Sequence, residues 1–170
     1  IDPATLERVE ASAPPGPAAR ASAGHDGSLK EKLLYRPLAT GAGAFRAQGY
    51  RVTLAGLAPT DSEETCGSGI DAWPCGVYAR TAFRNWLRGR ALTCMVPPSP
   101  PGDDIVIAEC RLGNQDPAEW LVAQGWARAA DDGPFAELGA RAQQERRGLF
   151  GTVPAATLPV TSAPSETSGG

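Results

Sequence analysis

Residues 51–76 read RVTLAGLAPTDSEETCGSGIDAWPCG, and the rest of the chain is organised around this stretch. Its first residues, Arg51 to Leu57, are rich in Val, Thr and Leu and predict a β-strand. A polar loop follows over Thr60 to Ile70, and a bond between Cys66 and Cys75 would close it on itself. Because functional groups concentrate on loops held by rigid elements, a chemical site is expected where the strand passes into this loop.

The bulk composition is that of one globular domain with tails. The chain has 170 residues, of which 42% are hydrophobic and 21% charged. No apolar run approaches the ~20 residues that a transmembrane helix needs. The net charge of −3 argues against a nucleic-acid-binding protein, since such proteins usually present a basic surface. The chain begins with Ile1 rather than Met, so a signal peptide or an N-terminal membrane anchor is expected to have preceded it.

Both ends of the chain are rich in small and turn-forming residues. Residues 1–27 are predicted to be a disordered linker and residues 152–170 a disordered tail, because neither contains enough apolar side chains to form a core. The folded domain is therefore expected over residues 28–151. The one histidine of the chain, His25, lies in the linker, where we expect a solvated side chain rather than a ligand or a base.

Short β-strands are predicted on both sides of a helix. Residues 28–35 (SLKEKLLY) form either a short helix or the start of a strand. Three strands then make a meander with turns at residues 41–43 and 48–49: Leu38–Thr40, Ala44–Ala47 and Tyr50–Leu57. Two further strands flank the proline-rich turn at 97–102, and as an antiparallel pair they would bring Cys94 and Cys110 opposite each other: Arg90–Val96 and Asp104–Leu112.

Three helices are predicted. The first, Gly76–Arg88, has apolar residues at helical spacing and an arginine row at i, i+4 and i+8, which is either a solvated face or a phosphate-binding ridge: Arg80, Arg84 and Arg88. Asp116 is the predicted N-cap of the second, Ala118–Gln124, and Pro134–Arg147 is the third. Five large apolar residues around these helices are predicted to be core: Trp120, Trp126, Phe135, Leu138 and Phe150.

The four cysteines allow three pairings, and closeness in sequence favours Cys66 with Cys75 and Cys94 with Cys110. Two disulfides imply an oxidising compartment. Four free thiols, or a zinc site formed by all four cysteines, are the alternatives, although structural zinc sites usually pair their ligands at shorter spacing.

The predicted order of three strands, a helix, two strands and two helices suggests a Greek-key barrel of the OB type. Five segments carry a resemblance to a known family: VTLAGLAP at Val52–Pro59, CG…PCG at Cys66–Gly76, YARTAFRNWLRGRALTC at Tyr78–Cys94, AEWLVAQGWARA at Ala118–Ala129 and AQQERRGLFG at Ala142–Gly151. Residues 50–151 thereby resemble the thermonuclease (staphylococcal-nuclease-like, or SNase-like) family, and the cysteines are similar to those of exported bacterial members. The resemblance implies a mainly β protein with helices (α+β), a five-stranded OB-fold barrel of the SNase-like type capped by three helices.

Members of this family hydrolyse phosphodiesters with calcium. The resemblance implies acidic metal ligands, a glutamate that positions water and two arginines that stabilise charge on the phosphate. In this chain each matching position is substituted. Gly41-Ala42-Gly43-Ala44 replaces an Asp-Gly-Asp-Thr turn, and Thr53 replaces an arginine. Ala58 or a deletion replaces the metal-binding aspartate, Thr60 or Asp61 replaces the glutamate, and Asp103-Asp104-Ile105 replaces a Tyr-Gly-Arg turn.

We therefore expect a catalytically degenerate thermonuclease-like domain, not an enzyme, that binds a protein partner or serves a structural role in an exported or membrane-associated assembly. No cofactor is expected. The alternative is a nuclease with a rewired site and calcium, and a second alternative is nucleic-acid binding without cleavage through Arg80, Arg84 and Arg88. The expected location is periplasmic or extracellular, free or tethered to a membrane. The rewired site has catalytic candidates Asp61, Glu63, Glu64 and Arg51, and metal-binding candidates Asp61, Asp103 and Asp104.

Overall fold

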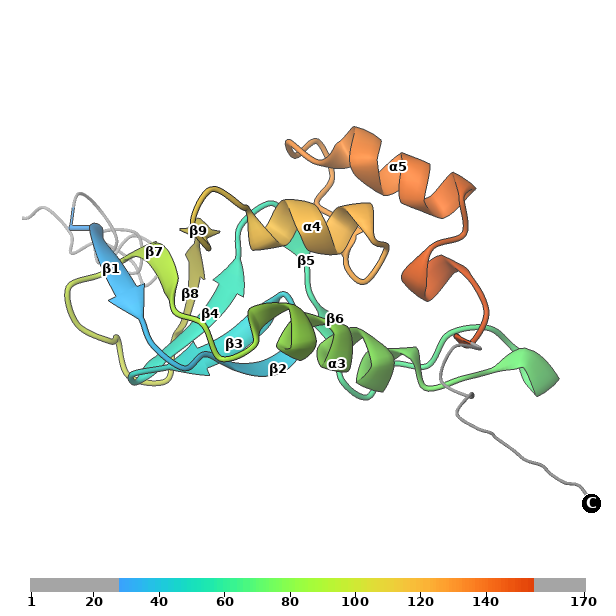
Figure 1. Cartoon of the computed structure of the whole chain (residues 1–170), viewed down its shortest axis with the longest axis horizontal. Helices are drawn as coiled ribbons and strands as arrows, with labels where there is room; N and C mark the ends of the chain where they lie inside the picture. Colours follow the sequence, from blue (N-terminus) through green and yellow to red (C-terminus); the bar gives the residue numbers. More distant parts are fainter. Residues whose placement is uncertain (1–27, 155–170) are drawn as a thin grey trace, which may run out of the picture.

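The computed structural model describes residues 28–154, which form a mixed α+β domain (Figure 1). This confirms the α+β part of the predicted class. The predictions for the linker at 1–27, including His25, and for most of the tail at 152–170 lie outside the described residues. Within the described part of the chain there are three α-helices, as predicted: α3 (Cys75–Leu87), α4 (Pro117–Ala123) and α5 (Ala136–Gln144).

The strands of the described residues form three hydrogen-bonded sheets, and no closed barrel is formed among them. The five-stranded sheet has the order β6-β2-β3-β4-β8, the three-stranded sheet β1-β7-β9, and the two-stranded sheet β10-β5. The strands are β1 (Lys30–Leu34), β2 (Leu38–Ala42), β3 (Ala44–Ala47), β4 (Tyr50–Leu54), β5 (Leu57–Ala58), β6 (Thr60–Asp61), β7 (Leu92–Val96), β8 (Ile105–Ala108), β9 (Cys110–Arg111) and β10 (Arg128–Ala129).

The predicted meander is β2-β3-β4. Its second turn has positive φ at Gln48 (49°) and Gly49 (87°), the geometry of a tight hairpin that matches strand twist. The predicted turn at 41–43 is wrong at its first two residues, since Gly41 and Ala42 belong to β2. A side chain at position 41 would collide with the carbonyl oxygen of Thr60, so glycine lets β6 pair there.

Two longer predicted strands are broken. The segment 50–57 ends as β4 at Leu54, because Gly56 turns the chain at a φ of 91° before β5. The segment 104–112 divides into β8, which runs parallel to β4, and β9, which runs antiparallel to β7. Residues 30–34 form a strand paired with β7, so the strand alternative for the first segment is the observed one.

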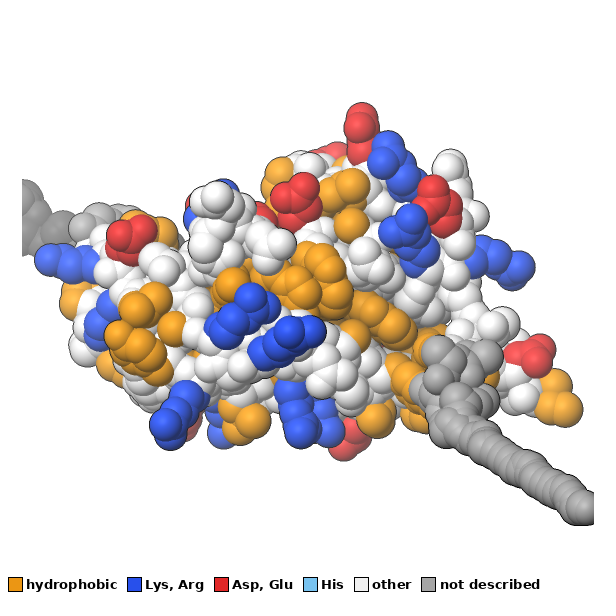
Figure 2. Space-filling view, in the orientation of Figure 1, with side chains coloured by type: hydrophobic (Ala, Val, Ile, Leu, Met, Phe, Trp, Pro, Cys, Tyr) orange, Lys and Arg blue, Asp and Glu red, His pale blue; other side chains and the backbone are white. Residues whose placement is uncertain are grey.

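Helix α3 lies along β2 and β6, and α4 and α5 lie above it in the view of Figure 1. Helix α4 begins as predicted, because the Asp116 carboxylate accepts hydrogen bonds from the N–H groups of Ala118 and Glu119. Helices α3 and α4 meet through Trp86 and Trp120, whose rings stack at 5.4 Å. A band of apolar side chains therefore lies between these helices, with positively charged side chains beside it (Figure 2). The basic residues of α3 are arginines.

The prediction that five large apolar residues are core overstates their burial. All five are half-buried and lie at the margin of the core rather than within it: Trp120, Trp126, Phe135, Leu138 and Phe150. The fully buried large side chains come instead from the strands and α3, with Tyr50, Phe45 and Phe83 the largest. Tyr50 also donates a hydrogen bond of 2.6 Å to the carbonyl of Pro97, which fixes the turn after β7.

The predicted disulfides are confirmed. Cys66 is bonded to Cys75, and Cys94 to Cys110, with no free cysteine in the chain. The second bond joins residues that are direct partners in the β7–β9 ladder. Both bonds are buried within the domain, and together they are consistent with an oxidising compartment.

Replacing both members of the second bond, with Cys94→Ala and Cys110→Ala, is expected to lower the free energy of unfolding by about 3 kcal/mol. The reason is that the bond closes a loop of 16 residues and so restricts the unfolded chain. Urea denaturation of the double variant and of the wild type measures the difference. A loss under about 1 kcal/mol would contradict the assignment, and reduced wild-type protein serves as the control.

Candidate functional site

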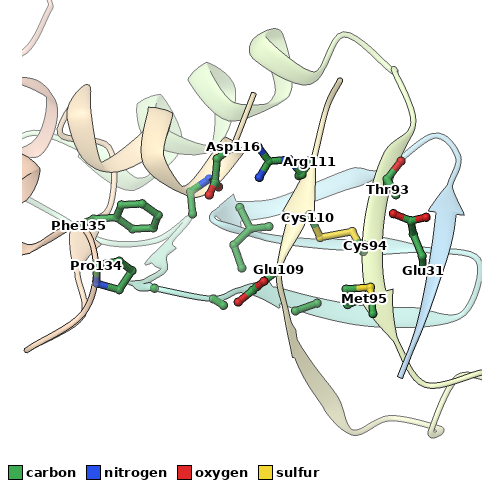
Figure 3. Close-up of a pocket in the computed structure, with 15 residues that line it drawn as sticks. Glu31, Thr93, Cys94, Met95, Glu109, Cys110, Arg111, Asp116, Pro134 and Phe135 are labelled. Carbon is green, nitrogen blue, oxygen red and sulfur yellow. A yellow bond between two sulfur atoms is a disulfide. The ribbon is translucent and has the colours of Figure 1, made fainter. Parts of the chain in front are cut away.

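A cavity of about 450 Å³ opens beside the Cys94–Cys110 disulfide (Figure 3). Pro134 and Phe135 lie on one side of it, and Met95 and Glu31 lie on the opposite side (Figure 3). The volume is within the range of small-molecule sites. None of the predicted catalytic, metal-binding or phosphate-binding residues lines the cavity, so the predicted site lies elsewhere.

Two glutamates give this cavity an acidic rim that was not anticipated. Glu31 is the cross-strand partner of Met95, and the N–H of Met95 donates to the carbonyl of Glu109 at 3.0 Å, so the two glutamates flank Met95. The wall opposite is mainly apolar, and Asp116 is already engaged as a helix cap. The arrangement offers an apolar surface with the carboxylates of Glu31 and Glu109 at one edge and Arg111 also in the lining.

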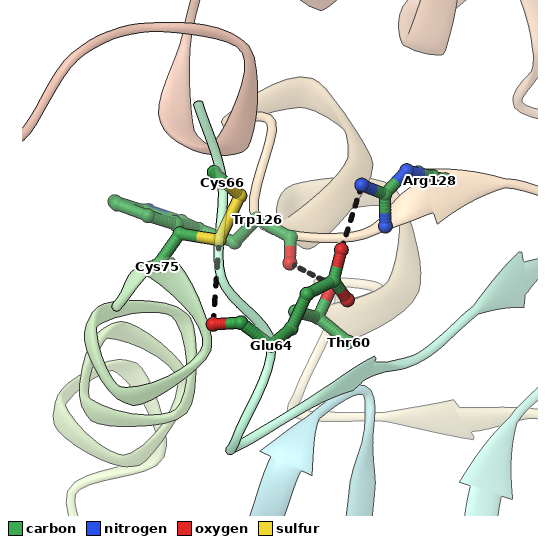
Figure 4. Close-up of polar contacts among 6 residues, drawn as sticks. All are labelled: Thr60, Glu64, Cys66, Cys75, Trp126 and Arg128. Atoms are coloured by element: carbon green, nitrogen blue, oxygen red, sulfur yellow. Dashed lines mark hydrogen bonds and ion pairs between the residues drawn. A yellow bond between two sulfur atoms is a disulfide. The ribbon is translucent and has the colours of Figure 1, made fainter. Parts of the chain in front are cut away.

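Thr60 stands where one alignment of the resemblance requires the catalytic glutamate. Its side chain is completely buried, and its hydroxyl donates a hydrogen bond of 2.8 Å to the carbonyl of Trp126 (Figure 4). A buried hydroxyl with its donor engaged is not available to orient an attacking water molecule. Thr60 therefore ties β6 to the chain after α4.

Asp61 stands at the same position in the other alignment. It is exposed, and its carboxylate accepts a hydrogen bond of 2.8 Å from the N–H of Glu63. Its carbonyl accepts from the N–H of Glu64 at 3.1 Å. These two bonds form a turn of the kind in which aspartate organises its own loop, and Glu63 itself points into solvent.

Glu64, in the loop after β6, forms an ion pair at 2.8 Å with Arg128 on β10 (Figure 4). Within the described residues, the group of metal-binding types whose ligand atoms come within 4.8 Å of one another is Glu64, Cys66 and Cys75. Because the two sulfurs are bonded to each other, this group offers a cation a single carboxylate. That carboxylate is already paired.

The other predicted acidic residues lie far from this loop. Asp103 and Asp104 precede β8, and β8 and β6 are the two edges of the five-stranded sheet. The structure therefore does not bring Asp61 together with either of them. Arg51 lies near the far edge, where its guanidinium donates a hydrogen bond of 2.8 Å to the carbonyl of Asp103.

The arginine row on α3 is shorter than predicted. Arg80 is half-buried and Arg84 is exposed, and both belong to the helix. Arg88 is the C-cap, with a left-handed φ of 49°, so it leaves the helical row. Arg90, beyond the helix, has its guanidinium carbon 5.7 Å from the centre of the Trp86 ring, which is a cation–π distance.

The outer face of the five-stranded sheet holds charged residues that are not part of this row. Arg46 on β3 and Arg51 on β4 are direct cross-strand partners, so their side chains lie on the same face. Exposed Ile105 and Ile107 follow on β8. The sequence did not reveal this face, because residues 105–108 (IVIA) are apolar on both sides of the strand and show no alternation.

No protein-family model matches the chain, and no curated protein matches its sequence. The described residues contain no helix that is long and apolar enough to cross a membrane. The class of protein is therefore defined at the level of a disulfide-bonded α+β domain, and a more specific assignment is a matter of proposal.

Replacing Thr60 with valine is expected to destabilise the domain by about 1–2 kcal/mol, because the carbonyl of Trp126 loses its donor. The matched control is Thr40→Val on the neighbouring strand, where the side chain is exposed and the effect is expected to be small. Chemical denaturation measures both. Equal effects at the two positions would show that the hydroxyl of Thr60 has no structural role.

Replacing Arg46 with glutamine is expected to stabilise the free domain by about 0.2–1 kcal/mol at low salt, because it removes a like-charge pair from facing strands. The gain should shrink as salt screens the charges. Arg141→Gln on α5 changes the net charge equally without touching the sheet and is the control. A thermal melt at two ionic strengths measures the effect, and destabilisation at low salt would contradict the interpretation.

Proposed function

We propose that the chain is a thermonuclease-like domain of the OB type that has lost catalysis and binds a protein partner. The order of strand pairing supports the OB assignment. The meander β2-β3-β4 continues into β8 by parallel pairing, β9 pairs with β7, and β7 pairs with β1. Only residues 35–37 separate β1 from β2, and only Glu109 separates β8 from β9, so the chain links the two sheets at both places. This order of strands supports a Greek-key arrangement of that type.

The observation that carries the loss of catalysis is the state of Thr60 and Asp61. One is buried with its hydroxyl bonded to Trp126, and the other has its carboxylate bonded to its own loop. Removing one charge-stabilising group from an active site typically costs orders of magnitude in rate. Here the two alternatives for the water-positioning residue both serve the fold, and the metal-binding candidates lie on opposite sheet edges.

A protein partner accounts for the surface better than a nucleic acid does. The net charge is −3, and the exposed strand faces carry aliphatic rather than aromatic side chains. The two disulfides fit a location outside the cytoplasm, periplasmic or extracellular, with the domain free or tethered to a membrane. An OB-type domain has a groove that is commonly used for partners, although the fold alone does not dictate the ligand.

The test is an assay of single-stranded DNA and RNA cleavage with calcium and then with a chelator. No cleavage above background is expected, because no metal-binding group of carboxylates is assembled in the described residues. The sample is shown to be folded by its disulfides and by a cooperative melt.

Cleavage that disappears with the chelator would overturn the proposal. The variant Asp61→Asn makes the test specific, because asparagine keeps the acceptor for the N–H of Glu63 and removes only the charge. Activity lost in this variant would place a rewired active site on the loop. Binding of the oligonucleotides without cleavage would favour the nucleic-acid alternative instead.

A further inference from the structure

The exposed face of the five-stranded sheet carries one row of side chains that runs across four strands. In the strand register, Leu38 pairs with Arg46, Arg46 with Arg51, and Arg51 with Ile105. Ile107 lies in the next row and is 71% exposed. The row therefore has an aliphatic residue at each end and two arginines in the middle. We call these four residues together with Ile107 the Arg46–Arg51 patch.

The two arginines have no acidic partner. The ion pairs of residues 28–154 join Arg128 with Glu64 and Arg147 with Glu145. The Arg51 side chain donates only to a backbone carbonyl, and the Arg46 side chain makes no hydrogen bond or ion pair within the same residues. Like charges directly opposite each other on neighbouring strands are unfavourable. An anion bound between the two arginines would therefore reduce their repulsion.

The surface beside the arginines is hollowed on both sides. A hollow of about 350 Å³ is lined by three arginines and one carboxylate, Arg36, Arg46, Arg51 and Asp103. One of about 120 Å³ lies on the other side, beside Thr53. Both arginines line both hollows. Their guanidinium groups are therefore accessible to a carboxylate, which two guanidinium groups can bind together through charge-assisted hydrogen bonds.

We propose that the patch binds an extended segment of a protein partner with the pattern aliphatic-x-acidic-x-aliphatic. This inference rests on the proposed function and names the chemistry of the partner. Neighbouring strands are about 4.8 Å apart, so the row from Leu38 to Ile105 spans about 14 Å. In an extended chain, side chains of one face recur every ~6.7 Å, so three of them cover the same length. The first and third pack on Leu38 and Ile105, and the central carboxylate lies between the arginines.

The apolar ends of the patch favour a protein segment over a nucleic acid. Leu38 is 62% and Ile105 54% exposed, and such side chains match the aliphatic side chains of a peptide. Single-stranded nucleic acids require aromatic rings on which bases stack, and the patch has none. The segment crosses the face of the sheet rather than extending its edge, because β3 and β4 are already paired on both sides.

The test is a titration of the ¹⁵N-labelled protein with the peptide Gly-Leu-Ser-Glu-Ser-Leu-Gly, followed by NMR up to millimolar concentration. Three probes are matched to it: the peptide with Lys in place of Glu, the peptide with Ser in place of both Leu, and a short oligothymidylate. Shifts confined to the Arg46–Arg51 patch, and caused by the first peptide alone, are expected. Arg46→Glu should weaken this binding about tenfold or more at low salt, since it replaces an attractive charge with a repulsive one. Arg141→Glu should leave it unchanged.

The inference is overturned if the first peptide shifts no residue of the patch, if the lysine peptide shifts it equally, or if the oligothymidylate binds there instead. Arg46→Gln is the second variant, because it keeps the length of the side chain should Arg46→Glu fail to fold. The peptide titration and the nuclease assay can fail independently of each other. Metal-dependent cleavage would overturn the proposed function whatever the peptide does, whereas no cleavage and no peptide binding would leave a binding module with a different docking surface.

Discussion

The loop that follows β6 lies against the first turn of α3 at a distance that only glycine permits. A Cβ at Gly76 would collide with the carbonyl of Asp61 and with the N–H of Glu64. The N–H of Gly76 donates in turn to the carbonyl of Glu64 at 2.9 Å, and the Cys66–Cys75 bond joins the loop covalently to the start of the helix. Overfilling such a contact costs about 1–3 kcal/mol, so the position of this loop depends on the missing side chain.

The placement of this loop decides what its acidic residues can do. Because the loop is held close, Thr60 becomes buried and bonds to Trp126, and Glu64 comes within reach of Arg128 on β10. Asp61 is left to organise the turn between them. A carboxylate that binds a metal must instead point its free oxygens at a shared centre. The same contacts that fix the loop therefore explain why the carboxylates of this loop do not point at one metal-binding centre in the described residues.

Local signals in the sequence predicted the local structure well. The helix 75–87, the meander and the Asp116 cap follow from periodicity, glycine turns and capping chemistry, which act over a few residues. The short strands β5 and β6 did not follow as separate strands, because each is defined by a partner far away in the sequence. The burial of Thr60 depends on such a contact too, since its partner lies 66 residues further on. For the same reason the candidate site could be outlined from the sequence, but the role of each side chain could not.

The two arginines on the exposed face of the five-stranded sheet contrast with the net negative charge of the chain. The chain as a whole is acidic, with a net charge of −3, yet the two arginines of the Arg46–Arg51 patch form no ion pair among the described residues. An acidic partner segment is therefore repelled by much of the surface and attracted to one face, which favours one orientation on approach. Two arginines kept opposite each other destabilise the free domain slightly and are relieved when a carboxylate binds between them. A binding site that is unfavourable when empty in this way discriminates by charge, because a neutral segment gains the aliphatic contacts but leaves the repulsion in place.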